Sequence, residues 1–103
     1  MEARLVIVTF PEESAAGIVR TLVEEHRIAC GNLLPGARSV YRWEGRVEEA
    51  VETVAILKTW SDRIDDLKRR LAELHPYDVP EILVFTVEEG LAGYLDWVRE
   101  STR

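Results

Sequence analysis

The chain has 103 residues, which suits one domain, so we expect a single domain over residues 1–103. Hydrophobic residues make up 47% of the sequence and charged residues 31%, a composition that excludes a disordered chain and is typical of a globular protein. The net charge of −6 disfavours nucleic acid as a partner, because an acidic surface repels phosphate backbones.

The cysteine content and the apolar runs bear on the compartment. Cys30 is the only cysteine, so no intrachain disulfide can form and a secreted disulfide scaffold is not indicated. The first residues lack the pattern of a signal peptide, and no apolar run approaches the roughly 18 residues of a membrane-spanning helix. We therefore expect a cytoplasmic protein with no membrane partner.

The first two predicted elements are a strand and a helix. Residues 5–10 form a short apolar, β-branched run closed by Pro11, which predicts a strand. Over residues 14–26 apolar positions recur at helical spacing beside a charged complement, which predicts an amphipathic helix.

A long β-hairpin is predicted next. Residues 28–34 and 39–43 favour strand on either side of a bend or bulge at the Pro-Gly pair of residues 35–36. Residues 44–46 predict a hairpin turn in which glycine supplies the unusual backbone angle. Residues 51–59 then form the second arm of the hairpin.

The second half of the chain repeats the helix and strand patterns. Residues 61–62 (Ser-Asp) are candidate caps for a helix whose apolar stripe spans residues 64–74. Two prolines make residues 75–81 a rigid connector. Residues 82–87 predict the last strand, and residues 91–98 a short C-terminal helix.

The predicted order β-α-β-β-α-β-α indicates an α+β protein with a ferredoxin-like, split β-α-β sandwich. We expect a four-stranded antiparallel sheet with two helices on one face, a long central hairpin and an additional C-terminal helix.

A single copy of this fold would leave apolar surface uncovered. Residues 5–8, 54–57 and 82–85 are continuous apolar runs, so both faces of the sheet should be apolar, whereas the two helices cover one face. The long hairpin would also overhang the sheet with unpaired edges. Both features predict a closed homo-oligomer. The alternative is that the C-terminal helix alone covers the second face.

Two residues are candidate metal ligands. His75 can ligate a metal through a neutral imidazole nitrogen, or it can make a structural hydrogen bond at the end of its helix. Cys30 is a soft ligand suited to copper or zinc, or else a small buried hydrophobe in a strand. No paired spacing typical of a closed zinc site is present.

Charges in or beside the apolar strands are candidates for a ligand site. Glu52, Lys58 and Glu81 occupy such positions, and a buried charge needs a partner. In an oligomer they would line an intersubunit cleft for a small ligand, together with four further residues: Tyr41, Arg42, Tyr77 and Tyr94. The alternative is that these charges form intersubunit salt bridges that fix the register. We expect Trp43 to lie in an interface.

The order and spacing of several motifs resemble the CutA family. The specific pieces are Tyr-Arg-Trp-x-Gly at residues 41–45 and His-Pro-Tyr-x-x-Pro-Glu at residues 75–81. The similarity extends over nearly the whole chain, from residue 9 to residue 97.

This resemblance implies a ferredoxin-like homotrimer whose hairpins cross between subunits, and a cytoplasmic protein linked to tolerance of divalent cations, copper among them. It also implies an architecture similar to that of PII-type signalling proteins, which bind nucleotides in subunit clefts. The copper ligands that the resemblance implies correspond to Val8, Leu74 and His75, so only the histidine is kept in this sequence.

Three functions remain as hypotheses. The first is a non-enzymatic homotrimer that binds divalent metal ions. The second is a PII-like module that binds a small anionic ligand through basic side chains: Arg38, Arg42, Lys58 and Arg63. The third is an enzyme with Glu81 or His75 as general base. No nucleophile-base-acid set stands out, so we expect no enzymatic activity.

Overall fold

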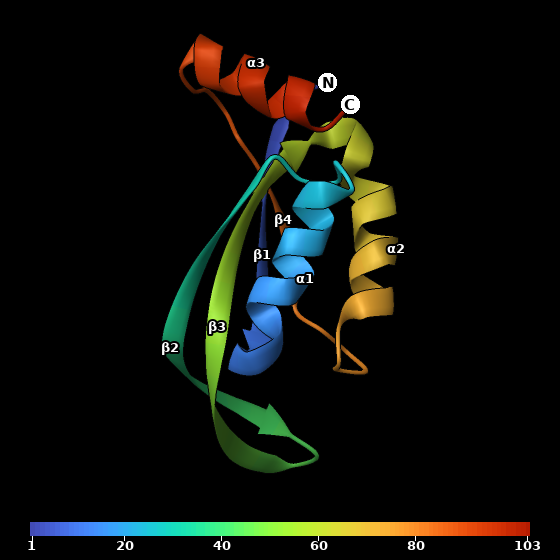
Figure 1. Ribbon diagram of the computed structural model, residues 1–103. Helices are drawn as coiled ribbons and strands as arrows, with labels where there is room; N and C mark the ends of the chain where they lie inside the picture. The colour runs from blue at the N-terminus through green and yellow to red at the C-terminus, as the bar shows by residue number, and fades with distance from the viewer.

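The computed structural model describes residues 1–103 and consists of one sheet and three α-helices (Figure 1). The elements are β1 (Ala3–Pro11), α1 (Glu12–Glu24), β2 (Cys30–Trp43), β3 (Arg46–Trp60), α2 (Ile64–Leu74), β4 (Ile82–Thr86) and α3 (Ala92–Ser101). The strand order is β2-β3-β1-β4, and each neighbouring pair is antiparallel. The predicted α+β, ferredoxin-like arrangement is therefore confirmed.

The core lies between the sheet and the layer formed by α1 and α2 (Figure 1). Side chains alternate across a strand, so Val6, Val8 and Phe10 of β1 point to the same face, and all three are fully buried. They pack with buried residues of the other elements: Ala15, Val19 and Leu22 of α1, Ala55 and Leu57 of β3, and Leu67 and Leu71 of α2. We call this the covered face.

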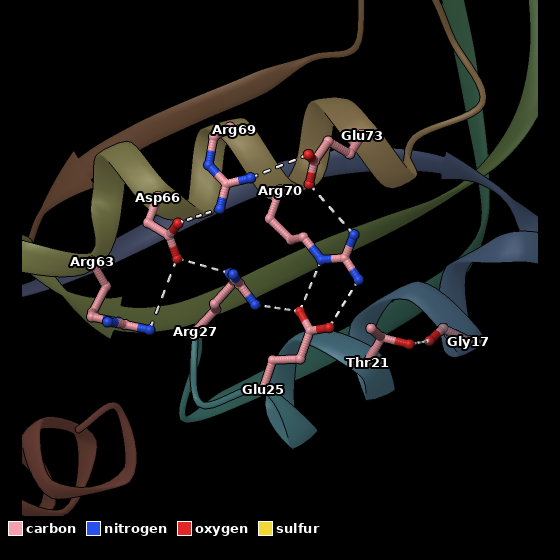
Figure 2. Close-up of polar contacts among 9 residues, drawn as sticks. All are labelled: Gly17, Thr21, Glu25, Arg27, Arg63, Asp66, Arg69, Arg70 and Glu73. Carbon is pink, nitrogen blue, oxygen red and sulfur yellow. Dashed lines mark hydrogen bonds and ion pairs between the residues drawn. The ribbon is translucent and has the colours of Figure 1, made fainter.

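Ion pairs join the two helices above the covered face. Figure 2 shows Arg70 of α2 in a two-pronged contact with Glu25 at the end of α1, with nitrogen–oxygen distances of 2.9 and 2.8 Å. Arg27 reaches back to Asp66 of α2 at 2.8 Å. The Arg70 guanidinium, by its hydrogen bonds, holds the pKa of Glu25 below its usual range. The network orients α1 against α2 from the solvent side.

The predicted side-chain cap of α2 is wrong. A short 3-10 helix, η1 (Ser61–Arg63), precedes α2, and neither Ser61 nor Asp62 caps a helix through its side chain. Instead, Ser61 Oγ accepts a hydrogen bond from the Glu2 amide at 2.9 Å. Asp62 accepts two from Arg103, each 2.7 Å long. The chain termini therefore use the polar groups that would otherwise cap the helix.

The hairpin of β2 and β3 is longer than predicted, with strands of 14 and 15 residues. The predicted bulge is confirmed, because the register shifts between Leu34 and Ala37 and Gly36 has a φ of 79°. At the turn, both Glu44 and Gly45 have positive φ angles, 48° and 76°, as the right-handed twist of the arms requires. Residues 46–51 of β3, between the turn and Glu52, pair only with β2, so the distal hairpin overhangs the sheet (Figure 1).

The opposite face of the sheet is largely uncovered. It carries Leu5, Ile7 and Thr9 of β1 and their register partners in β3 and β4, among them Leu83 and Phe85. We call this the open face. Leu83 is 50% exposed and Phe85 45% exposed. Helix α3 covers one end of this face, where its Val98 is buried beside Ala3. The alternative in which α3 covers the whole face is therefore excluded.

Candidate functional site

The larger of two cavities lies on the open face, between the distal hairpin and the connector that joins α2 to β4. Its volume is about 540 Å³. Ten residues line it: Thr9, Ser39, Val40, Tyr41, Trp43, Glu52, Tyr77, Asp78, Val79 and Glu81. The cavity thus joins β1, both hairpin arms and the connector, which lie far apart in the sequence.

His75 fixes the connector to the sheet. Because β4 pairs with β1 only up to Val8, the carbonyl of Thr9 lies at an unpaired edge, and His75 Nε2 bonds to it at 2.7 Å. His75 Nδ1 accepts the Tyr77 amide at 3.1 Å, so Nε2 must carry the proton and donate. The ring also stacks on Phe10, with centroids 4.8 Å apart. Metal ligation by His75 would require the loss of one of these hydrogen bonds.

Glu52 and Tyr77 form the polar centre of the cavity. The Tyr77 hydroxyl donates to Glu52 Oε2 at 2.8 Å. Only 7% of Glu52 is exposed, yet no lysine, arginine or histidine forms an ion pair with its carboxylate. Burial, reinforced by the Glu52 hydrogen bond, raises the pKa of Tyr77 to about 12. The phenol therefore remains a protonated donor at neutral pH.

The charge of the cavity lining has one sign. Glu52, Asp78 and Glu81 contribute carboxylates, and no lysine, arginine or histidine belongs to the lining. Three acids facing a partly enclosed space lower the local electrostatic potential, because the low-dielectric walls focus the field. This arrangement favours a cation over an anion.

The structure divides the predicted ligand residues between two places. Four line the large cavity: Tyr41, Glu52, Tyr77 and Glu81. Lys58 and Tyr94 instead line a second cavity of about 180 Å³ beneath α3. Glu52 pairs with Pro11 at one end of the β1–β3 ladder, whereas Lys58 pairs with Leu5 near the other end. Arg42 lines neither cavity.

Sequence reasoning missed five cavity residues: Thr9, Ser39, Val40, Asp78 and Val79. Thr9 and Ser39 were detectable, because each shares a sheet face with Glu52 once the register is known. Asp78 and Val79 carried no such signal, since the connector has no periodic pattern.

Comparison with known proteins decides the family. The sequence profile described as CutA1 divalent ion tolerance protein matches residues 4–101. The chain belongs to the CutA family. A divalent-cation tolerance protein CutA of Pyrococcus horikoshii is 48% identical over 100 residues, which cover 96% of this chain and 97% of that protein.

Solved CutA structures share the fold. The PII-like protein CutA from Nostoc sp. superposes with a TM-score of 0.93 at 38% identity, over 97% of each chain. A protein of Archaeoglobus fulgidus described as the periplasmic divalent cation tolerance protein CutA has a TM-score of 0.94 at 32% identity, over 98% of this chain and 99% of that chain. Because this relative is described as periplasmic, a cytoplasmic location for the present chain stays a prediction. No helix here is both long and apolar enough to traverse a bilayer.

The positions related to copper in the CutA resemblance have structural roles here. Val8 is fully buried in the covered face, and Leu74 packs against the same core. Cys30 lies on the open face, 3.8 Å from Lys58 Nζ, which places it at the other end of the sheet from His75. No three of the chain's His, Cys, Asp and Glu side chains are arranged to hold a metal ion. Metal binding by His75 and Cys30 stays a prediction.

Proposed function

We propose that this CutA-family protein acts in divalent-cation tolerance and binds a divalent cation, copper among the candidates, in the acidic cavity of the open face. The observation that carries the proposal is the Glu52 carboxylate. It is buried, lines the cavity and has no cationic partner within the chain. Burial of an ion without a countercharge is unfavourable, so a bound cation would stabilise it.

We propose further that the working form is a homotrimer. Leu83 and Phe85 expose about half their surface on the open face, and the overhanging hairpin presents unpaired strand edges. Neighbouring copies would cover both, as the CutA resemblance implies. The large cavity borders the overhanging hairpin, so it would lie close to an intersubunit cleft.

A PII-like signalling role is the second candidate, supported by the 38% identity to the Nostoc protein described as PII-like. The charge of the large cavity argues against an anionic ligand there. Two of the expected basic residues are already paired, Arg38 with Glu49 and Arg63 with Asp66. Of the four expected basic residues, only Arg42 and Lys58 form no ion pair within the chain, so a nucleotide bound by this set would lie near one of them.

We propose binding without catalysis. The candidate general base His75 has both ring nitrogens in structural hydrogen bonds. Glu81 lines the cavity together with the hydroxyls of Thr9 and Ser39, but it makes no hydrogen bond to either, and no histidine, lysine or cysteine lines the cavity.

Calorimetric titration of Cu²⁺ and Zn²⁺ into the wild type and four variants tests the cation site. We expect saturable binding that weakens at least about tenfold in Glu52→Gln and is unchanged in Asp65→Asn, a control that removes one charge from an exposed position of α2. If His75→Ala or Cys30→Ser abolishes binding while Glu52→Gln does not, the metal site must be assigned to that residue instead of the acidic cavity. Equal, weak heats in all five proteins would contradict a metal site.

Sedimentation at low micromolar concentration tests the assembly. We expect a mass about three times the 11.8 kDa of one chain, and dissociation in Leu83→Lys because the charge would be buried at the interface. Stable single chains of the wild type would contradict the homotrimer.

A further inference from the structure

The large cavity has the dimensions and walls of a site for an organic molecule. We propose that it binds an organic ammonium ion, whose alkyl groups contact the aromatic walls while the Glu52 carboxylate compensates its charge. The inference rests on the proposed function only in taking the ligand to be a cation. It adds the chemical class of a ligand that would compete with a metal ion.

The volume is the first argument. A cavity of about 540 Å³ greatly exceeds the space of a metal ion with its direct ligands. It falls in the range of about 300–1,000 Å³ typical of small-molecule sites. A metal ion held by Glu52 would leave most of this space to water.

The walls are the second argument. Half of the ten lining residues are apolar or aromatic: Val40, Tyr41, Trp43, Tyr77 and Val79. These side chains offer a metal ion no good ligand. Aromatic ring faces do attract ammonium ions, through the negative charge concentrated above the ring, and quaternary ammonium groups are commonly recognised in this way. Apolar walls beside acids suit a cation that carries its own alkyl groups.

The third argument is the unused oxygen of Glu52. The side chain is more than nine-tenths buried, and only its Oε2 has a partner, the Tyr77 hydroxyl. Oε1 makes no hydrogen bond within the chain and is not sealed off as a buried unpaired atom. It is therefore accessible from the cavity that Glu52 lines. A cation placed there would remove the penalty of the buried charge.

A pair of matched ligands separates charge from shape. Choline and 3,3-dimethyl-1-butanol have the same outline, but only choline is charged. We expect choline to bind the full-length protein saturably in calorimetry and to bind at least about tenfold more tightly than the alcohol. The preference for choline should disappear in Glu52→Gln and persist in Asp65→Asn, the exposed control.

A second variant tests the aromatic walls. Trp43 is 51% exposed in the single chain, so Trp43→Leu should leave the fold of the chain intact; circular dichroism verifies the fold, and sedimentation verifies that the proposed assembly persists. We expect choline affinity to fall at least about fivefold, because leucine has no ring face. Choline and the divalent cation should also compete in the wild type. This variant keeps the inference testable if Glu52→Gln fails to fold.

The outcomes distinguish this inference from the proposed function. Divalent cations that bind while choline does not would overturn the ammonium site and leave the metal role intact. Equal affinity for choline and the alcohol would show a merely apolar pocket and would also overturn it. Choline binding that depends on Glu52, with no metal binding, would support the ammonium site and contradict the metal role.

Discussion

The two faces of the sheet are equally apolar in sequence but differ in the structure. On the covered face, Val8 and Leu57 are completely buried beneath α1 and α2. On the open face, Leu83 and Phe85 of the equally apolar β4 remain about half exposed. An apolar sequence pattern therefore indicates that a surface is buried, but it does not distinguish burial within one chain from burial between chains.

The polar groups of the two faces differ in the same way. On the covered face, the buried Thr59 hydroxyl donates to the Arg27 carbonyl at 2.7 Å, so its hydrogen-bonding need is met inside the chain. On the open face, one oxygen of the buried Glu52 carboxylate has no partner. Around Val8, Leu57 and Thr59 the covered face is complete in a single chain, whereas the open face leaves apolar side chains and a carboxylate oxygen without a partner.

The largest expected effect comes from matched leucines on the two faces. Leu57→Ala would leave a cavity in the closed core and should destabilise the chain by about 2–5 kcal/mol. Leu83→Ala removes a half-exposed side chain and should cost less than about 1 kcal/mol in dilute, dissociated protein. Urea unfolding at several protein concentrations measures both. If the proposed homotrimer forms, the loss of unfolding free energy in Leu83→Ala, but not in Leu57→Ala, should grow as the protein concentration rises, because only Leu83 would be buried between chains.

Equal losses for the two variants in dissociated protein would remove the distinction between the faces. A Leu83→Ala loss that does not grow with protein concentration would instead contradict burial of this residue by a second copy.

A smaller effect is expected at Gly31, where β2 approaches α1 on the covered face. A Cβ atom there would press on Val19 Cγ1 and lie 3.0 Å from Leu57 Cδ2. Gly31→Ala should therefore destabilise the chain by about 1–3 kcal/mol, measured by urea unfolding. In a Val19→Ala background the loss should shrink, because the opposing methyl groups are absent.

Gly17→Ala is the control for this close approach. Nothing lies within 4 Å of a Cβ at Gly17, which is in the interior of α1, so alanine should stabilise the chain by about 0.5–1 kcal/mol. Strictly additive losses for Gly31→Ala and Val19→Ala would show that the helix moves freely away from the strand.

The elements with a buried face could be predicted from the sequence, because burial imposes periodicity. The distal half of β3 could not be: its Val47–Glu49 segment is exposed on all sides and is a strand only because β2 pairs with it. The candidate site, too, could be predicted only as far as the strand pattern reached. Glu52 and Lys58 were expected in one cleft, and they do share a face of the sheet, but six residues of strand span about 20 Å, so they line different cavities.

The smallest expected effect is a titration on the open face. Tyr77 has its pKa raised to about 12, mainly by burial and then by the Glu52 hydrogen bond. An ultraviolet absorbance titration should show a phenol with a midpoint near 12 that is absent in Tyr77→Phe. Glu52→Gln should lower this midpoint because the nearby negative charge is lost, while the contribution of burial remains.

The same shift predicts how stability depends on pH. A tyrosine in the unfolded chain ionises near pH 10, whereas folded Tyr77 keeps its proton up to about pH 12. Between these values the folded state binds more protons than the unfolded state, so the free energy of unfolding should fall as the pH rises. Tyr77→Phe should reduce this slope, and Tyr94→Phe serves as the exposed control. An unchanged slope in Tyr77→Phe would mean that the open face, even around Glu52, is more hydrated than its geometry indicates.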